Sequence, residues 1–154
     1  DVVDGADPQH WLRAGAVLTA AFQAGMAHAC VEQATDYAKA RTQFDRPIGS
    51  FQAVKHLLAD ALVRAEVART AVHAAAVTLD DPEVGDLDRA VAGAKLLAGE
   101  AALKNAKTSV QVHGGMGFTW EVDAHLYLKR AWLTNTAFGT PDAAADAVTA
   151  AAAG

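Results

Sequence analysis

The stretch that decides the fold is residues 7–41, DPQHWLRAGAVLTAAFQAGMAHACVEQATDYAKAR. Asp7 can accept hydrogen bonds from the first free N–H groups of a helix, and Pro8 suits the first helical position because no donor is needed there. Single glycines are the strongest helix breakers in this stretch. Apolar or small residues recur in it at steps of three and four: Trp11, Gly15, Leu18, Phe22, Met26 and Ala29. The pattern predicts one helix of roughly 50 Å that ends at about Arg41.

A second long helix is predicted after a short loop. Residues 42–50 contain a loop-forming aspartate, proline and glycine, and Ser50 is the expected N-cap of the next helix. That helix should stop before Asp81 and Pro82. Its apolar face consists of Val54, Leu57, Leu58, Ala61, Leu62, Ala65, Ala68, Val72, Ala76 and Leu79.

The remaining helices follow a polar, acidic linker over residues 80–88. A third helix is predicted to end at Gly114 and Gly115. Its apolar face holds Val91, Ala94, Leu97, Ala98, Ala101, Ala102 and Val110. A shorter fourth helix fits residues 121–132, and residues 140–142 begin an alanine-rich tail over residues 141–154 that we expect to fray.

These elements predict an all-α fold, an up-down four-helix bundle of long antiparallel helices. No strand-type alternation persists, and 38 of the 154 residues are alanine, which lets helices pack closely. The length fits a single helical domain over residues 1–154.

Composition excludes several classes of function. The formal net charge is −5 and the Lys and Arg residues are scattered, so we expect neither nucleic-acid binding nor attachment to an anionic membrane. Polar residues interrupt every apolar run, which argues against a membrane span: Arg13, Gln23, His28, Lys55, Arg64, Lys95 and Lys104. The single cysteine, Cys30, lies in an apolar helical pattern, so we expect a buried side chain and a reducing, cytoplasmic compartment.

The six histidines do not indicate a metal site. Helical carboxylate-bridged sites use a Glu-x-x-His step, and that step does not occur in this sequence. We therefore expect His113 and His125 to be structural or surface residues. The glycines after His113 end a helix instead of opening one after a strand, which excludes a dinucleotide-binding loop of the Rossmann type. A pair such as Gly114 and Gly115 still lets a ligand approach the backbone closely, although a simple helix stop is the alternative.

Three motifs together resemble the C-terminal helical domain of an acyl-CoA dehydrogenase. They are RTQFDRPIGSFQ at residues 41–52, QVHGGMGF at residues 111–118 and FGT at residues 138–140. Their order, spacing and intervening long helices match that family over residues 11–140. The resemblance implies an FAD-dependent oxidoreductase that dehydrogenates acyl-CoA thioesters between the α and β carbons, with the acyl chain, fatty or steroid, left open.

The resemblance also implies a set of residues that contact FAD. They are Arg41, Gln43, Phe44 and Phe51 in the first motif, Gln111, Gly114 and Gly115 in the second, and Thr140 in the third. An arginine suits phosphate oxygens, although Arg41 could simply complement the helix dipole and Thr140 could simply cap a helix. Family members share FAD across subunits, so we expect a homo- or hetero-oligomer, a dimer or tetramer.

The base that removes the α-proton is missing from the expected places. The family glutamate usually precedes the Gly-Thr of the third motif, where this sequence has Phe138. A minority of members carry it at the position of Gly15, followed by arginine, where this sequence has Ala16. We therefore predict no catalytic residue, as in a subgroup in which two unlike subunits associate and one supplies the base.

Two alternatives stay open. The first is a conventional dehydrogenase with a displaced base such as Glu121 or Asp142, and the second is a flavin-free helical assembly module. Family members are more than twice as long as this chain, with an N-terminal helical domain and a middle β-domain. We therefore expect the chain to be the C-terminal part of a longer flavoprotein and to be inactive in isolation.

Overall fold

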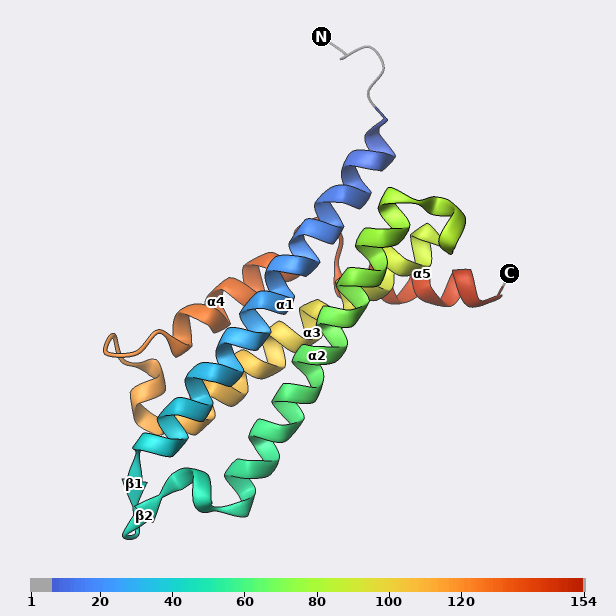
Figure 1. Ribbon diagram of the computed structural model, residues 1–154. Coiled ribbons are helices and arrows are strands. Elements are labelled where there is room, and N and C mark those ends of the chain that lie inside the picture. The colour runs from blue at the N-terminus through green and yellow to red at the C-terminus, as the bar shows by residue number, and fades with distance from the viewer. Residues whose placement is uncertain (1–6, 154) are drawn as a thin grey trace.

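The computed structural model describes residues 7–153 and has the predicted all-α architecture (Figure 1). Its long helices are α1 (Pro8–Ala40), α2 (Gln52–Asp80) and α3 (Leu87–His113), and its shorter helices are α4 (Ala124–Asn135) and α5 (Pro141–Ala153). The connections contain the strands β1 (Thr42–Gln43) and β2 (Arg46–Pro47) and the 3₁₀ turns η1 (Ile48–Ser50), η2 (Pro82–Val84) and η3 (Gly114–Phe118).

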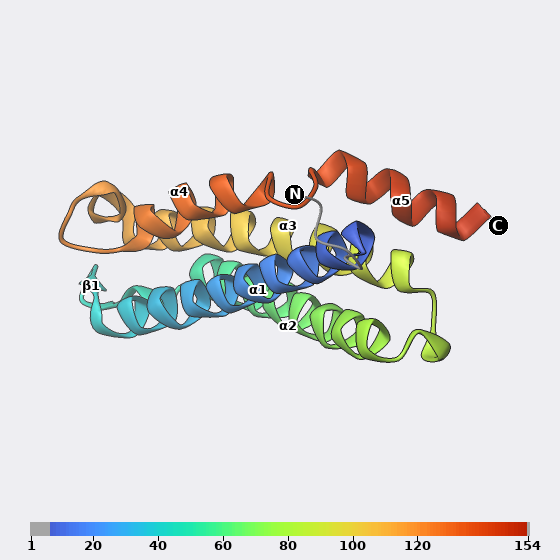
Figure 2. The ribbon, with the colours of Figure 1, turned by 90° about the horizontal axis from the view of Figure 1, so that it is seen from above.

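Helix α3 lies at the centre of the molecule. It packs against each of the other four helices, while α1 and α2 also pack on each other. Figure 2 shows α4 and α5 on the side of α3 that faces away from α2. Helices α1, α2, α3 and α4 therefore form an up-down bundle. Helix α5 runs across the N-terminal end of α3.

Side-chain caps explain most helix starts. Asp7 accepts from the backbone N–H of Gln9 at 2.9 Å, and Asp86 accepts from that of Arg89 at 3.0 Å. Thr140 accepts from the backbone N–H of Ala143 at 3.3 Å, so its predicted capping role is confirmed.

The structure corrects two predicted boundaries. Ser50 is not the N-cap of α2, because residues 48–50 form the turn η1 and Phe51 takes the N-cap position without a side-chain bond. Helix α4 begins at Ala124, later than predicted, because Thr119 organises a turn in which it accepts from the N–H of Glu121 at 3.4 Å.

The core is built mostly from alanine, and the large apolar residues whose spacing indicates helix α1 are not all part of it. Trp11, Leu18 and Phe22 are exposed, Leu18 by 71%, whereas Met26 is buried. The buried stripe of α1 is made of small residues for the most part: Ala16, Val17, Ala20, Ala24, Ala27, Cys30, Val31, Ala34 and Ala38. Alanine lets the backbones of α1, α2 and α3 approach closely, so large side chains are left outside.

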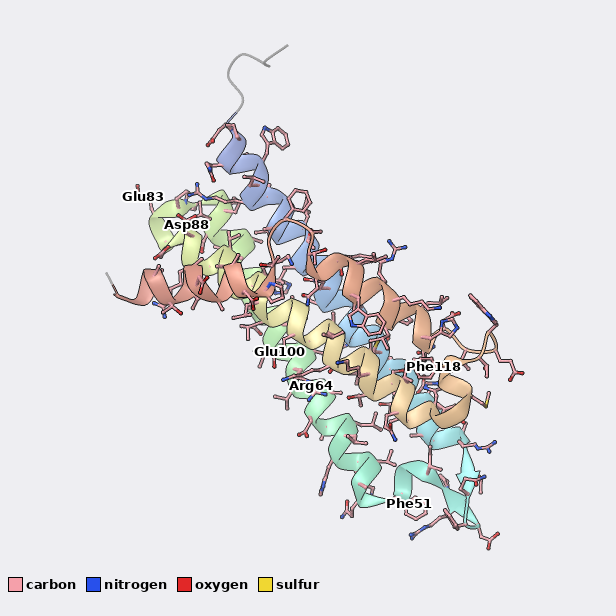
Figure 3. The ribbon with its side chains drawn as sticks, turned by 180° about the vertical axis from the view of Figure 1, so that it is seen from behind. Phe51, Arg64, Glu83, Asp88, Glu100 and Phe118 are labelled. Carbon is pink, nitrogen blue, oxygen red and sulfur yellow. The ribbon has the colours of Figure 1, made fainter. Side chains whose placement is uncertain are left out.

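Asn105 ties the three long helices together from α3. It is 1% exposed, and its amide donates to the backbone oxygens of Ala27 in α1 at 3.1 Å and Ala61 in α2 at 2.8 Å. Its oxygen accepts from Nε of Arg64 at 2.9 Å, and Figure 3 shows Arg64 on α2 beside α3. Such a satisfied polar group sets the register of an otherwise uniform core.

Helix α1 also bears on two predictions, the absence of a membrane span and the burial of Cys30. Among residues 7–153 it is the one helix that is long and apolar enough to span a membrane, but half of its most apolar window is buried in the bundle. A core helix has this property, so it is weak evidence for a span. Cys30 is buried as predicted, and burial raises the pKa of its thiol to about 12.

Candidate functional site

The hairpin after α1 presents the residues of the first motif. The backbone N–H of Arg41 donates to the oxygen of Tyr37 at 2.8 Å, and its own oxygen accepts from the N–H of Ile48 at 2.8 Å. At the hairpin tip, Phe44 and Asp45 have φ values of 53° and 60°, the left-handed region that two-residue turns of this kind require. This turn holds the Phe44 side chain outward, 86% exposed.

Phe51 forms the base of the same hairpin. The rings of Phe44 and Phe51 meet edge to face with centroids 6.1 Å apart. The guanidinium of Arg46 lies 4.0 Å from the centroid of the Phe51 ring, a cation–π contact. Gln43 donates to the backbone oxygen of Thr42 at 2.8 Å, so its amide serves the hairpin itself.

The second motif lies at the C-terminal end of α3. Gly114 has a φ of 60°, a conformation that favours glycine, and Gly117 is packed so closely that a Cβ there would lie 2.6 Å from the backbone oxygen of Val110. Gly115 has neither constraint, because a Cβ there would meet nothing within 4 Å among the described residues. No contact within residues 7–153 requires glycine at position 115.

An aromatic stack brings the two motifs to one end of the bundle. The ring of Tyr37 in α1 stacks on that of His113 in α3 with centroids 4.3 Å apart, and its hydroxyl donates to Sδ of Met116 at 3.7 Å. His113 is buried and its Nδ1 lies 2.7 Å from the backbone oxygen of Ser109. His113 is therefore structural, as predicted. We call this end, residues 41–51 and 111–118, the hairpin end; Phe51 and Phe118 mark it in Figure 3.

Two polar side chains of the hairpin end have no partner within residues 7–153. Arg41 and Gln111 are exposed, and within residues 7–153 their side chains make no hydrogen bond or ion pair. By contrast, Lys39 in the last turn of α1 pairs with Asp36 at 3.5 Å. A free guanidinium, a free amide and open glycine backbone form a donor set that fits a pyrophosphate.

Thr140 lies elsewhere, in the connection between α4 and α5. Phe138 in that connection packs its ring over Gly15 in α1, where a Cβ would lie 2.7 Å from Cζ of the ring. Residues 15 and 41 are separated by about 39 Å at 1.5 Å of helix rise per residue. The structure thus separates Thr140 from the residues of the hairpin end.

Lys95 of α3 binds the C-terminal end of α4, just before this connection. Its side chain is 3% exposed, and Nζ donates to the backbone oxygens of Thr134 at 3.5 Å and Asn135 at 3.2 Å, at the end of α4. Burial lowers the pKa of its ammonium group, and helix C-terminal carbonyls favour the cation. We call residues 134–140 with Gly15 and Lys95 the loop end.

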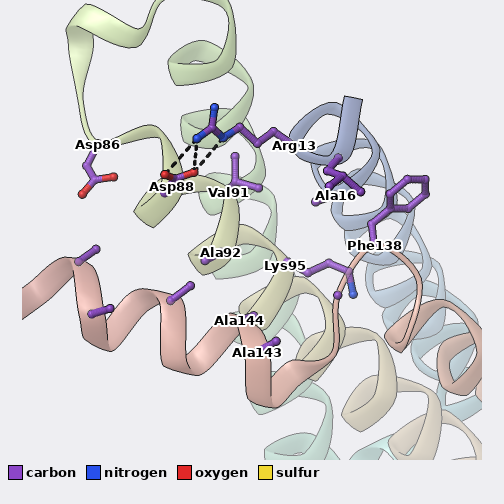
Figure 4. A pocket seen from close by; sticks show the side chains of 15 residues that line it. Arg13, Ala16, Asp86, Asp88, Val91, Ala92, Lys95, Phe138, Ala143 and Ala144 are labelled. Carbon is purple, nitrogen blue, oxygen red and sulfur yellow. Dashed lines mark hydrogen bonds and ion pairs between the residues drawn. The ribbon is translucent and has the colours of Figure 1, made fainter. Parts of the chain in front are cut away.

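A cavity of about 620 Å³ opens at the loop end between α1, α3 and α5. Figure 4 shows Phe138 and Lys95 on its wall beside Ala16, with Ala143 and Ala144 of α5 opposite. An ion pair between Arg13 and Asp88, 2.8 Å between Nη2 and Oδ1, lies at its rim. Alanine is the most frequent residue in the wall, and Lys95 is its buried cation.

Three of the buried polar residues, all in or against α4, were not expected to be buried. Lys95 was counted only as an interruption of an apolar run, yet it lies four residues after Val91 on the predicted buried face of α3. Gln23 is fully buried and donates to Oγ1 of Thr134 at 3.3 Å. His125 is buried against the Trp120 ring, with centroids 4.9 Å apart and no hydrogen-bond partner among residues 7–153. Their positions on apolar stripes were the available signal.

The two residues considered as displaced bases lie differently. Glu121 precedes α4 and Phe138 follows it, so the length of α4, about 18 Å at 1.5 Å per residue, separates them. Asp142 is exposed in the first turn of α5, two residues beyond Thr140. Of the two, Asp142 is the nearer to the loop end along the chain.

Comparison with known proteins assigns the family. The family model described as "Acyl-CoA dehydrogenase, C-terminal domain" matches residues 8–153. Acyl-CoA dehydrogenase FadE34 of Mycobacterium tuberculosis is 51% identical over 116 residues, which are 75% of this chain and 16% of that protein. This chain therefore spans only a small part of that relative.

Solved structures agree. Butyryl-CoA dehydrogenase from Megasphaera elsdenii superposes with a TM-score of 0.87 at 29% identity, over 93% of this chain and 37% of that one. The ChsE4–ChsE5 complex from Mycobacterium tuberculosis gives a TM-score of 0.84 at 34% identity, over 92% of this chain and 38% of that one. The chain belongs to the acyl-CoA dehydrogenase family, and residues 8–153 form the C-terminal domain of that family.

Proposed function

We propose that this chain is the FAD-binding helical domain of an acyl-CoA dehydrogenase-family oxidoreductase and is the C-terminal part of a longer flavoprotein. The observation that carries the proposal is the hairpin end, where exposed Arg41 and Gln111 lack partners within residues 7–153 and Gly115 has no internal reason to be glycine. A ligand outside the chain accounts for all three. The donor set matches the pyrophosphate of a dinucleotide.

The roles follow from chemistry. Arg41 holds phosphate oxygens with its planar guanidinium, Gln111 donates from its amide, and Gly114 and Gly115 let the ligand approach the backbone. Phe44, held out by the turn at the hairpin tip, offers its ring for packing against an aromatic part of the cofactor. Gln43 and Phe51 lie in the same hairpin and are proposed to contact FAD as well. Their described contacts hold the hairpin together, because Gln43 donates to the oxygen of Thr42 and Phe51 packs on the ring of Phe44.

The separation of the two ends supports an oligomer. Thr140 follows Phe138, whose ring packs on Gly15, and Gly15 lies about 39 Å along the helix axis from Arg41, so we propose that the two ends of one chain contact different FAD molecules. We propose that each FAD lies between chains, with the hairpin end of one chain and the loop end of another on either side. The ChsE4–ChsE5 complex, a structural neighbour, is by its name an assembly of two different chains.

We further propose that this subunit does not supply the catalytic base. Dehydrogenation of an acyl-CoA thioester needs a base for the α-proton, while bound FAD supplies the acceptor for the β-hydride. Phe138 and Gly15, at the two positions where the family carries its glutamate, cannot accept a proton. The base therefore comes from a partner subunit.

Flavin absorbance tests this proposal directly. The longer native protein should be purified alone and together with the product of the neighbouring gene, and reduced with fatty acyl-CoA and steroid side-chain thioesters. We expect bound flavin that is reduced only in the paired preparation. Reduction by the lone protein would instead support a displaced base such as Asp142, and absence of flavin from both preparations would support a flavin-free assembly role.

A substitution at the hairpin end tests the residue assignment. Arg41→Ala should weaken FAD retention by a factor of about 10 or more, because a charge-assisted bond to phosphate contributes about 1.5–3 kcal/mol. Lys39→Ala is the matched control, since Lys39 is an exposed cation of the same helix that already pairs with Asp36. Equal retention in the two variants would show that Arg41 does not hold the cofactor.

A further inference from the structure

The loop end contains a contact between two residues that lie far apart in the sequence. The Phe138 ring covers Gly15 so closely that a Cβ on residue 15 would lie 2.7 Å from Cζ, and closer still to Cε1 and Cδ1. Real Cβ atoms essentially never come within 3.0 Å of a neighbour. No side chain fits at position 15 while the Phe138 ring stays in place.

Phe138 has a strained backbone and is held by the notch at Gly15, while 54% of the residue is exposed. Phe138 has a φ of 54°, in the left-handed region that costs a residue with a side chain about 1–2 kcal/mol. Strain of this kind persists only where surrounding contacts impose it. Two such contacts are present: the notch at Gly15, and the bonds from Lys95 to the backbone oxygens of Thr134 and Asn135 just before the loop.

The notch is specific to one glycine of α1. Gly25 lies in the same helix, and a Cβ there would meet nothing within 4 Å among the described residues. Glycine in a helix interior is less favourable than alanine by about 0.5–1 kcal/mol. At position 15 that cost is offset by the fit of the Phe138 ring, whereas at position 25 the described contacts offer no such gain.

We propose that Gly15 and Phe138 form a steric lock that closes this end of the bundle to a carboxylate. Phe138 occupies its own position without a titratable group, and its ring fills the volume that a side chain on residue 15 would need. One substitution at residue 15 cannot therefore introduce a base, whereas replacement of Phe138 can. The catalytic role assigned to positions 15 and 138 rests on the proposed function. The packing of Gly15 against Phe138 is independent of it.

A double-mutant cycle in thermal unfolding of the longer native protein tests the packing. Gly15→Ala should lower the unfolding midpoint by roughly 3–10 °C when Phe138 is present, because the new methyl collides with the ring. In a Phe138→Ala background the same change should raise the midpoint by roughly 1–4 °C, as alanine favours the helix. Gly25→Ala, the matched control, should raise it in both backgrounds.

The sign reversal is the diagnostic result, because a general loss of folding would lower the midpoint in every background. Phe138 is half-exposed, so its truncation leaves the alanine core intact. If Gly15→Ala had the same effect in both backgrounds, the lock would be overturned.

Flavin reduction in the longer native protein, without a partner subunit, tests what the lock controls. Phe138→Glu, and Gly15→Glu combined with Phe138→Ala, should each allow reduction by acyl-CoA thioesters, whereas Gly15→Glu alone should not. Reduction by Gly15→Glu alone at the rate of the double variant would overturn the lock. If no variant reduced flavin while the sign reversal held, the packing inference would stand and the proposed function would fail.

Discussion

The hairpin end and the loop end hold candidate site residues of opposite character. At the hairpin end, Arg41 and Gln111 are exposed without side-chain partners in residues 7–153, and Gly115 is open to solvent. At the loop end, Lys95 is buried with two backbone acceptors and Gly15 is filled by the Phe138 ring. Contacts within the described residues therefore account for Gly15 and Lys95 at the loop end, but they do not account for Arg41, Gln111 and Gly115 at the hairpin end.

Substitution of Gly117 should have the largest effect on stability. Gly117 lies at the hairpin end, but it is packed against the chain itself, as Gly15 is at the loop end. A Cβ at position 117 would press against the backbone of Val110, which cannot move aside as a side chain could. We expect Gly117→Ala to lower the free energy of unfolding by about 2–3 kcal/mol in urea titrations. Gly115→Ala, two residues away, should change it by less than about 0.5 kcal/mol.

A similar loss in both glycine variants would break the comparison. It would mean that Gly115 is also required by the fold, and the argument that a ligand explains it would be lost.

Substitution of Lys95 tests whether contacts within the chain stabilise the loop end. Lys95→Met keeps most of the buried stem but leaves the backbone oxygens of Thr134 and Asn135 without their donor. We expect a loss of about 2 kcal/mol in the free energy of unfolding. Lys107→Met, an exposed change on the same helix, is the control and should have little effect.

The pH dependence of that difference sharpens the test. Burial lowers the pKa of Lys95 from its ordinary 10.5, so between its folded and unfolded pKa values the unfolded chain binds more protons. The free energy of unfolding due to Lys95 should then rise as the pH increases toward about 10.5. A difference between wild type and Lys95→Met that is constant over this range would contradict it.

Cys30 does not obscure this measurement. Its thiol pKa rises from 9.0 to about 12 on folding, so the unfolded chain releases that proton first and stability falls as the pH increases above 9.0. This opposing effect is present in both proteins and cancels in the difference.

Asp45 tests backbone strain at the hairpin tip, with a smaller expected effect. Its φ of 60° is a conformation in which glycine is free of the steric cost. Asp45→Gly should raise the free energy of unfolding by about 0.5 kcal/mol, after the added flexibility of the unfolded chain is subtracted. Ser50→Gly, in the turn η1 of the same connection, should lower it instead.

Gln111 should have the smallest effect on stability and a clear effect on the ligand. Gln111→Ala removes an exposed amide without partners within the described residues, so the free energy of unfolding should stay within about 0.5 kcal/mol of wild type. Flavin retention by the longer native protein should nevertheless fall. Loss of stability without loss of flavin would reverse our assignment of this residue.

The hairpin end and the loop end also differ in how far their residues could be predicted from the sequence. Arg41, Gln111 and Gly114 belong to contiguous motifs, whose order and spacing are visible without any structure. Lys95 belongs to no such motif, and its acceptors are backbone oxygens of α4 that no pattern of side chains reveals. Sequence reasoning therefore found the candidate residues that face outward and missed those that are satisfied inside the chain.

By itself, the sequence determined the helices and the family motifs, because caps, helical periodicity and motif spacing act within short segments. The start of α1 at Asp7 and Pro8 and the end of α3 before Gly114 are of this kind. The tertiary structure alone decided which face of α1 is buried and that Gly15 meets Phe138. Hydrophobicity favours burying Leu18 and Phe22, but the close approach of three helices favours alanine at most of the buried positions, and that approach exists only once the helices have packed.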